Sequence, residues 1–225
     1  MSPLWGLISG EPDALPQFLS FAVAIVIGIT VHEFAHAKAA QKAGDPTPGQ
    51  HGRVTLNPLA HFDPIGTVAL LFAGFGWGRP VPVNPFLMRR PRIDNILVSL
   101  WGPLSNFIVA IVFAMPFRVT LLLPPSTAMG YAEAVLKPYG IVLTYIVFMN
   151  LILGLFNLLP IYPLDGSHIL SGLLPLASAR KYDLFVHRYG LLLLLLLFVS
   201  RATIFVVGVP AQLAFWLLTG IRMGF

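Results

Sequence analysis

The sequence predicts an all-α polytopic membrane protein, with about four to six membrane helices and a re-entrant or extended element after the first of them. The chain of 225 residues is 56% hydrophobic and only 10% charged, with a mean hydropathy of +0.80, whereas soluble domains carry about 25% charged residues. Residues 95–117 and 138–164 are uncharged throughout, and each run is long enough to span a bilayer. We expect residues 1–225 to form a single membrane-embedded domain, surrounded by the lipid bilayer.

The composition also excludes several classes of protein and site. The net charge is +5, but the basic residues cluster in short connections between apolar segments, as orientation signals do. We therefore expect no nucleic-acid partner. Cysteine is absent, which excludes a disulfide framework, a thiolate metal site and a cysteine nucleophile. Any bound metal must use histidine and carboxylate ligands.

The first membrane helix is predicted to run from Pro16, a residue type favoured in the first turn, to just before Gly44, a favoured C-terminal cap. Residues 1–16 lack the basic region of a signal peptide, so we expect the apolar segment to be retained. Lys38 and Lys42 follow the apolar part. Because basic residues are in excess on the cytoplasmic side of membranes, this end of the helix is predicted to be cytoplasmic.

A His-Glu-x-x-His motif lies near that end of the helix. His32 and His36 are four residues apart, which places them on one helix face at a spacing that suits a single zinc ion. Glu33 lies beside that face, where it can take a proton from a water that the metal activates. Two core histidines are the alternative, but ionisable groups inside lipid are costly and mostly functional. We predict one Zn2+ per chain, close to the cytoplasmic surface.

The connection at residues 44–94 is rich in proline, glycine and arginine. Within it, residues 65–78 are uncharged but too short and too rich in glycine to span, so a re-entrant or interfacial element is predicted. Residues 79–85 contain three prolines and are typical of extended, edge-strand-like backbone. We interpret His51 and His61 as loop histidines, not as metal ligands.

The apolar run at residues 95–117 contains a Gly-Pro-Leu-Ser-Asn segment at 102–106. Small residues let membrane helices approach closely, and the Asn106 amide can bond to a neighbouring helix. The sequence by itself favours this packing role and a catalytic role equally. Residues 118–137 are predicted to form an outer connection, from which residues 138–164 return the chain to the cytoplasmic side.

The end of this returning run carries a second group of candidate site residues. Pro160 and Pro163 must break the helix, and broken backbone at membrane depth is tolerated only inside protein or beside a wet cavity. Asp165 follows at the depth of the two histidines, and either Asp165 or His168 can supply the third protein ligand of a catalytic zinc. Asp165 is preferred because a carboxylate partly neutralises a divalent ion inside lipid.

The remaining residues carry weaker signals. Residues 167–179 are predicted to form a short interfacial helix, and the leucine-rich residues 189–200 belong to a last span that Arg201 interrupts. The Gly-Val-Pro segment at 208–210 is predicted to break the apolar segment at the end of the chain.

The motifs together resemble the site-2 protease family of intramembrane zinc metalloproteases, peptidase family M50. The His-Glu-x-x-His helix and the Asn-Leu-Leu-Pro-Ile-Tyr-Pro-Leu-Asp-Gly segment at 157–166 carry the resemblance. Leu-Asn-Pro-Leu-Ala-His at 56–61, Pro-Val-Pro-Val-Asn-Pro at 80–85 and the segment at 102–106 are further similar to its small bacterial and archaeal members. The resemblance thus covers most of residues 20–170. No PDZ or CBS domain is evident, and Ser-His follows Asp-Gly where small members often have Gly-Arg.

The resemblance implies a role for each candidate residue: zinc binding by His32, His36 and Asp165, general base catalysis by Glu33, and stabilisation of the substrate or oxyanion by Asn157 and Asn106. It also implies a re-entrant element at residues 63–85. The implied protein is a multi-pass zinc endopeptidase of the cell membrane, with its active site near the cytoplasmic face. Its substrates would be single-span membrane proteins, cut within or near their transmembrane segments.

Two other functions fit the sequence less well. A non-catalytic zinc-binding membrane scaffold that binds transmembrane helices needs the metal ligands but has no use for Glu33. A transporter would show internal repeats or several intramembrane charges along a path, and neither is evident in the sequence.

Overall fold

A computed structural model describes residues 3–73 and 76–222, and this part of the chain is helical without a named strand. The α-helices are α1 (Pro3–Ser9), α2 (Ala14–Ala43), α3 (Thr47–Gln50), α4 (Pro64–Ala73), α5 (Pro91–Leu122), α6 (Pro125–Tyr131), α7 (Lys137–Asn157), α8 (Asp165–Leu173), α9 (Leu176–Val199) and α10 (Val209–Thr219). Four helical segments are long and apolar enough to cross a membrane: Ala14–Ala43, Pro91–Leu122, Pro125–Asn157 and Leu176–Val199. The predicted all-α polytopic membrane fold is confirmed.

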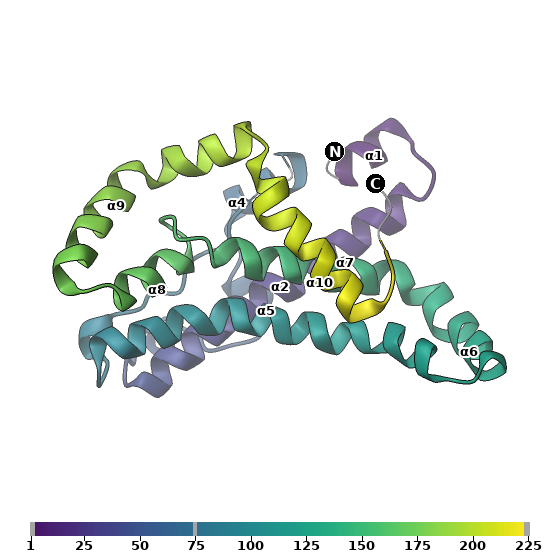
Figure 1. The fold of residues 1–225 in the computed structure, drawn as a ribbon, viewed down its shortest axis with the longest axis horizontal. Helices are drawn as coiled ribbons and strands as arrows, with labels where there is room; N and C mark the ends of the chain where they lie inside the picture. The colour runs from purple at the N-terminus through teal and green to yellow at the C-terminus, as the bar shows by residue number, and fades with distance from the viewer. Residues whose placement is uncertain (1–2, 74–75, 223–225) are drawn as a thin grey trace.

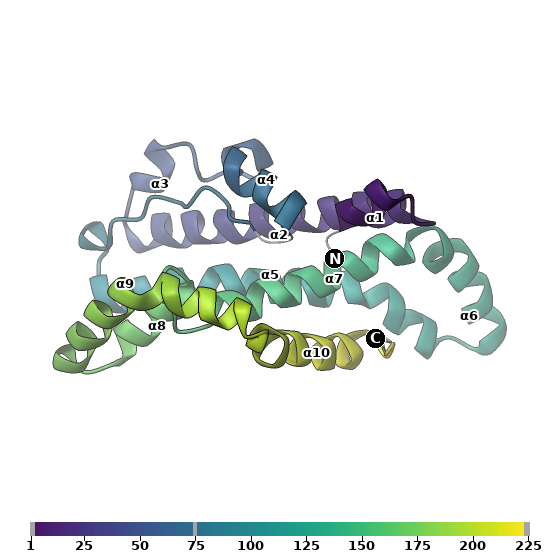
Figure 2. The same ribbon diagram turned by 90° about the horizontal axis from the view of Figure 1, so that it is seen from above.

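Helices α2, α5 and α7 pack against one another and form the centre of the molecule (Figure 1). Viewed from above (Figure 2), α2 lies on one side of α5 and α7 together with α3 and α4, and α9 and α10 lie on the other side. Helix α8 packs against α5 and α9. In the most apolar 18-residue stretch of α9, only 11% of the residues are buried, so most of its leucines are available to lipid.

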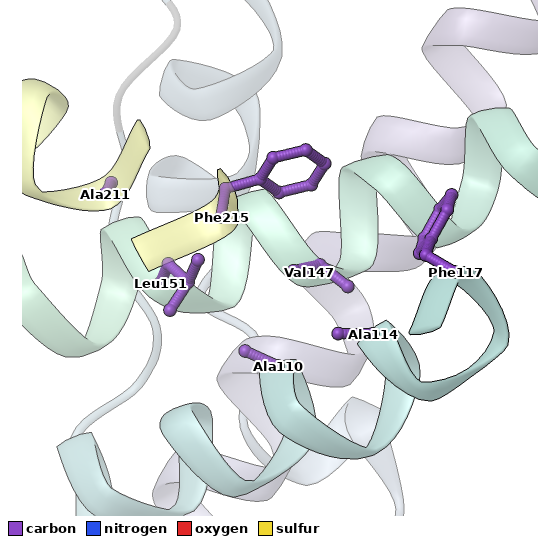
Figure 3. Close-up of a cluster of buried hydrophobic side chains, with 7 residues drawn as sticks. All are labelled: Ala110, Ala114, Phe117, Val147, Leu151, Ala211 and Phe215. Carbon is purple, nitrogen blue, oxygen red and sulfur yellow. The ribbon is translucent and has the colours of Figure 1, made fainter. Parts of the chain in front are cut away.

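The largest apolar core joins α5, α7 and α10 (Figure 3). Its buried members are Ala110, Ala114 and Phe117 of α5, Val147 and Leu151 of α7, and Ala211 and Phe215 of α10. The alanines of α5 leave room for the larger side chains of the facing helices, as small residues do at helix contacts in membranes.

The first predicted helix is confirmed almost to the residue. Helix α2 begins at Ala14 and ends at Ala43, and Gly44 caps it in the left-handed conformation with φ 109°. Its backbone N–H bonds to carbonyl oxygens of the last turn, which is the usual use of glycine at this position.

The predicted outer connection at residues 118–137 is wrong in its extent. Helix α5 continues to Leu122, α6 starts at Pro125, and a π-helical turn at Ala132–Leu136 leads directly into α7. The charged residues interrupt the apolar sequence, but the backbone stays helical at each of them. Lys137 pairs with Glu133 one turn away, at 2.8 Å, and Arg118 donates to the carbonyl oxygens of Leu217 and Leu218 at the end of α10.

The break predicted at residues 208–210 is also misplaced. A second π-helical turn, Ile204–Gly208, precedes α10, and Pro210 lies within the first turn of that helix. Each π-turn ends two residues before a proline, Pro138 or Pro210, and the wider turn accommodates the missing N–H donor. The chain breaks instead at Arg201, whose φ is 57°.

The predicted interfacial helix at 167–179 is divided in two. Helix α8 ends at Leu173, and Pro175 is the N-cap of α9, which begins at Leu176. The last long helix therefore starts well before the leucine-rich residues 189–200. Proline fits the beginning of a helix but not its interior, so Pro175 sets this boundary.

The segment after α2 is irregular, as predicted. Helix α4 covers residues 64–73, and residues 76–84 run without regular structure except for an isolated antiparallel bridge between Phe62 and Gly78. A 3-10 turn at Pro85–Leu87 then leads towards α5. Asn84 has the extended backbone predicted for residues 79–85, with φ −114° and ψ 97°; the extended conformation of the rest of this stretch, and its insertion into the bilayer, stay predictions.

Candidate metal centre

Three polar side chains from two distant parts of the chain meet where α2 and α8 approach each other. The Nε2 atoms of His32 and His36 are 3.0 Å apart. Asp165 is the first residue of α8. Its Oδ2 atom lies 3.2 Å from Nε2 of His32, and its Oδ1 atom lies 3.2 Å from Nε2 of His36. Among the described residues, these three form the one cluster of histidine and acidic side chains with metal-binding spacing, and neither His51 nor His61 belongs to it.

Hydrogen bonds behind the two imidazoles determine which ring nitrogen carries the proton. The Nδ1 atom of His36 lies 2.8 Å from the carbonyl oxygen of Val98, which can only accept, so Nδ1 donates. The Nδ1 atom of His32 lies 2.7 Å from Oδ1 of Asn106, another acceptor. In a neutral imidazole, the Nε2 atom then carries a lone pair, and both lone pairs are on the side of Asp165.

With both imidazoles neutral, this arrangement brings acceptors together without donors between them. The two Nε2 lone pairs and the carboxylate of Asp165 converge, and Oδ2 of Asp165 is buried without a hydrogen-bond donor. Converging acceptors repel one another unless a cation lies among them. Two histidines and one carboxylate form a ligand set of catalytic zinc sites, which keep a further position open for water or substrate. The residues therefore fit a zinc ion.

Helix α5 is shaped to leave space for the two imidazoles. A Cβ atom on Gly102 would lie 2.3 Å from Nε2 of His36 and 2.8 Å from Cε1 of His32. Any larger residue at this position must displace a ligand ring. The Gly-Pro-Leu-Ser-Asn segment thus places its glycine against the ligands and its asparagine one turn further along.

Asn106 is fully buried and connects three helices through its amide. Its oxygen faces His32 of α2, and its nitrogen donates to the carbonyl oxygen of Gly28 in α2 at 3.0 Å and to Oδ1 of Asn150 in α7 at 2.9 Å. All of its polar atoms are occupied, and it does not line the cleft in front of the metal ligands. Asn106 therefore lies behind the imidazole of His32 and outside the cleft.

This cleft has a volume of about 580 Å³ and opens in front of the three clustered side chains. Its polar lining consists of His32, Glu33, His36, Asn95, Ser99, Asn157, Asp165 and His168. Asn157 lies at the end of α7 and donates to the carbonyl oxygen of Leu153 at 3.0 Å. His168 lines the same cleft one turn after Asp165, and burial lowers the pKa of its imidazole. The predicted site residues other than Asn106 therefore share one cavity.

Another wall of the cleft is backbone without regular structure, and we call residues 79–84 the edge segment. Its backbone forms hydrogen bonds with three side chains, where a regular strand would pair with a neighbouring strand. Arg53 donates to the carbonyl oxygens of Arg79 and Pro80 at 2.7 and 2.6 Å. The N–H of Val81 donates to Oε2 of Glu33 at 3.1 Å. The N–H of Asn84 donates to a carboxylate oxygen of Asp45 at 2.7 Å.

Sequence reasoning missed several of these supporting residues. A usable signal existed for Asn150, because it is one of only two asparagines in the apolar run at 138–164, and amides inside membrane helices commonly bond across helices. Asp45 and Arg53 lie in a loop, where no periodicity indicates their partners. Gly102 was predicted to be a small packing residue, but its contact with the imidazoles depends on how α2 and α5 cross.

Comparisons with known proteins show similarity to a peptidase family and to proteins named as zinc metalloproteases. The model of peptidase family M50 matches residues 127–199. The candidate zinc metalloprotease YwhC of Bacillus subtilis is 39% identical over 189 residues, which are 84% of this chain and 83% of that protein. The candidate zinc metalloprotease Rip2 of Mycobacterium tuberculosis is 30% identical over 155 residues, 66% of this chain and 55% of the relative. No solved structure gives a significant match.

Proposed function

The chain belongs to peptidase family M50, and from this premise we propose that it is an intramembrane zinc endopeptidase. It is a multi-pass membrane protein with a metalloprotease site, and its relatives are named as zinc metalloproteases. The proposed reaction is hydrolysis of peptide bonds within or near the transmembrane segments of single-span membrane proteins. The proposed place is the cell membrane, with the active site near the cytoplasmic face, and residues 1–225 act as a single domain.

One observation carries the proposal. Three acceptor groups, on His32, His36 and Asp165, converge at distances of 3.0 to 3.2 Å on the wall of a cleft that Glu33 also lines. A cluster that only stabilised the fold would include donors for these acceptors. A binding scaffold would need the three ligands but not a carboxylate beside them.

The residues divide the chemistry among them. His32, His36 and Asp165 would hold the ion, and zinc when bound supplies Lewis-acid activation of water and of the scissile carbonyl. Glu33 acts as the general base. Since the N–H of Val81 occupies Oε2 of Glu33, Oε1 is the atom that accepts the proton and later delivers it to the leaving nitrogen.

The substrate must expose its backbone to be cut. A transmembrane helix hides its carbonyl groups in internal hydrogen bonds, so the segment to be cleaved has to unwind. The edge segment offers backbone without regular structure in the same cleft as the metal ligands, and pairing with it would hold the unwound substrate as an added strand. Asn157 lies in the same cleft and would bond to the substrate or the oxyanion, whereas Asn106 would position His32.

Replacing Glu33 by Gln tests the assignment. Glutamine keeps an acceptor for the N–H of Val81 and leaves the metal ligands intact, but it cannot take up the proton. We expect cleavage of a single-span substrate by purified protein in detergent to fall by about 10²- to 10⁴-fold, with bound zinc unchanged by metal analysis. A chelator should abolish cleavage by the wild type. Undiminished turnover by Glu33→Gln would refute the base assignment, and a zinc-loaded wild type that binds substrates without cutting them would indicate the scaffold.

A further inference from the structure

A second hollow, of about 320 Å³, lies beside the edge segment and shares Pro80 with the cleft. Its lining is His51, Arg53, Ala60, Arg79, Pro80 and Pro82. Two of these residues are cationic at neutral pH, a third is a histidine, and no acidic residue is among them. The chemistry proposed for the metal centre uses none of the three basic side chains.

Arg53 is the buried member of this group, with 4% of its surface exposed. Its guanidinium donates to the carbonyl oxygens of Ala60, Arg79 and Pro80, which are all neutral acceptors. No ion pair of the described residues includes Arg53 or Arg79. A buried charge without a direct ion pair is costly. Burial and the neighbouring charge of Arg79 lower the pKa of Arg53 and outweigh the carboxylate of Glu33, which raises it, although a guanidinium stays protonated in proteins.

We propose that this hollow is an anion site that binds a phosphate group, as carried by an anionic lipid headgroup or by free phosphate. A phosphate would supply the direct ion pair that the two arginines lack, and guanidinium groups match its oxygens in geometry. His51 and Arg79 are exposed at the opening, so the ligand can enter from outside.

The surroundings favour a lipid as the source of the phosphate. Leu59, next to the lining residue Ala60, is 83% exposed, and Phe86, just beyond the edge segment, is 90% exposed. Apolar side chains as open as these, beside basic ones, are typical of surfaces that meet a membrane interface. A headgroup in the hollow would contact Arg53 and Arg79 directly, and so would support the edge segment through the arginine that bonds to its carbonyl oxygens.

Direct binding measurements test the site independently of zinc and of cleavage. The whole protein, purified in a neutral detergent, is titrated with phosphatidylglycerol in mixed micelles and, in a separate arm, with inorganic phosphate. We expect one saturable ligand per chain. Arg79→Gln should weaken binding about tenfold or more, as loss of one charge-assisted contact does. His51→Gln should weaken binding less.

Arg89→Gln is the matched control, because Arg89 is an exposed arginine of the same connection that does not line the hollow. Its affinity should stay within about twofold of the wild type. If Arg79→Gln and Arg89→Gln lose affinity equally, the binding is general charge attraction and the proposed anion site is refuted. Binding that does not saturate would refute the site as well. If only the lipid binds saturably, the ligand is a lipid headgroup. If inorganic phosphate also binds and Arg79→Gln weakens its binding as much as that of the lipid, the ligand is a soluble anion. Since neither arm measures proteolysis, the site can fail while the proposed function stands, and the reverse.

Discussion

The two walls of the cleft are built in opposite ways. On one wall, His32, His36 and Asp165 project from helices, and hydrogen bonds to Asn106 and Val98 fix both imidazoles from behind. On the other wall, the edge segment belongs to no named strand; it is held by side chains that reach its backbone and by one backbone hydrogen bond, from the N–H of Arg79 to the carbonyl oxygen of His61 at 2.7 Å. We therefore expect the helical wall to be the more rigid one, because the position of the other wall is set by a few separate polar contacts.

This difference indicates a division of labour. A metal site needs ligands placed to within a fraction of an ångström, which packed helices provide. A surface that pairs with an unwound peptide must keep its backbone groups available, which a regular sheet interior does not. Glu33 belongs to both walls, since it projects from α2 and accepts from Val81. We therefore expect changes in the helical wall to affect metal binding and turnover, and changes in the edge wall to affect substrate affinity.

The largest effect is expected at Asp165. Asp165→Ala removes the carboxylate that faces both Nε2 atoms, and we expect it to lose most of its zinc and all of its cleavage activity. His168→Ala is the matched control, because His168 lies one turn away in the same cleft but outside the metal cluster. It should keep its zinc and most of its activity. Metal analysis and cleavage rates of both purified variants measure this, and the reverse pattern would make His168 the third ligand.

The next effect is expected at Gly102. Gly102→Ala places a methyl group 2.3 Å from Nε2 of His36, so the ring must move or the helices must separate. We expect zinc affinity to fall by about 10- to 100-fold, as when the support of a metal ligand is disturbed. Gly140→Ala in α7 is the control, since a Cβ there meets nothing within 4 Å. Competition with a chromophoric chelator measures both affinities, and unchanged zinc affinity in Gly102→Ala would mean that the helical wall is not rigid.

A comparable or smaller loss is expected at Asn106. Asn106→Leu removes the acceptor that orients His32 and the bonds to Gly28 and Asn150. Zinc affinity should fall by about 10-fold, and turnover should fall with it while the KM for substrate changes little. Ser105→Ala is the control, because it removes a buried hydrogen bond to Gly102 in the same helix without touching a ligand. A rise in KM alone would instead support contact between Asn106 and the substrate.

The two walls also differ in how far the sequence predicts them. The spacing of His32 and His36 on one helix specifies their shared face, and Pro160 and Pro163 indicate where the chain breaks before Asp165. These signals are local, because helical periodicity and proline stereochemistry act within a few residues. The zinc site was therefore predictable, and Asp165 was preferred to His168 because of its charge, its position after the proline-broken segment and the family resemblance.

The edge wall was predicted only as extended backbone. Its supports, Arg53 and Asp45, are 27 and 39 residues away from the positions that they hold, and no pattern in a proline-rich loop indicates such partners. The helical wall has a similar gap, since the role of Asn106 depends on the crossing of three helices. The π-turns before Pro138 and Pro210 were missed because the sequence shows the proline but not the adjustment that accommodates it.

The smallest effect is expected at the far end of the edge segment, where Asp45 bonds to two backbone N–H groups. One carboxylate oxygen accepts from Thr47 at 2.9 Å and the other accepts from Asn84 at 2.7 Å. In Asp45→Asn, one of these oxygens becomes an NH2 group that faces a donor. We expect a loss of about 1 to 3 kcal/mol in the free energy of unfolding, a several-fold rise in KM, and unchanged zinc content.

The dependence of this loss on pH identifies the carboxylate as its source. Burial raises the pKa of Asp45, but the hydrogen bonds from Thr47 and Asn84 outweigh it and lower the pKa below the ordinary value of 3.8. A carboxyl group whose pKa is lower in the folded state stabilises that state fully above the unfolded value, and the contribution disappears as the pH falls through the folded value. The difference in thermal midpoint between the wild type and Asp45→Asn should therefore be equal at pH 7 and pH 5, and it should shrink only below about pH 4.

Asp63→Asn is the control, because Asp63 accepts the N–H of Gly66 at the start of α4 and does not hold the edge segment. The KM of this variant should match that of the wild type. A difference that already closes between pH 7 and pH 5 would assign the effect to another titrating group, and an unchanged KM in Asp45→Asn would show that the edge wall keeps its position without this contact.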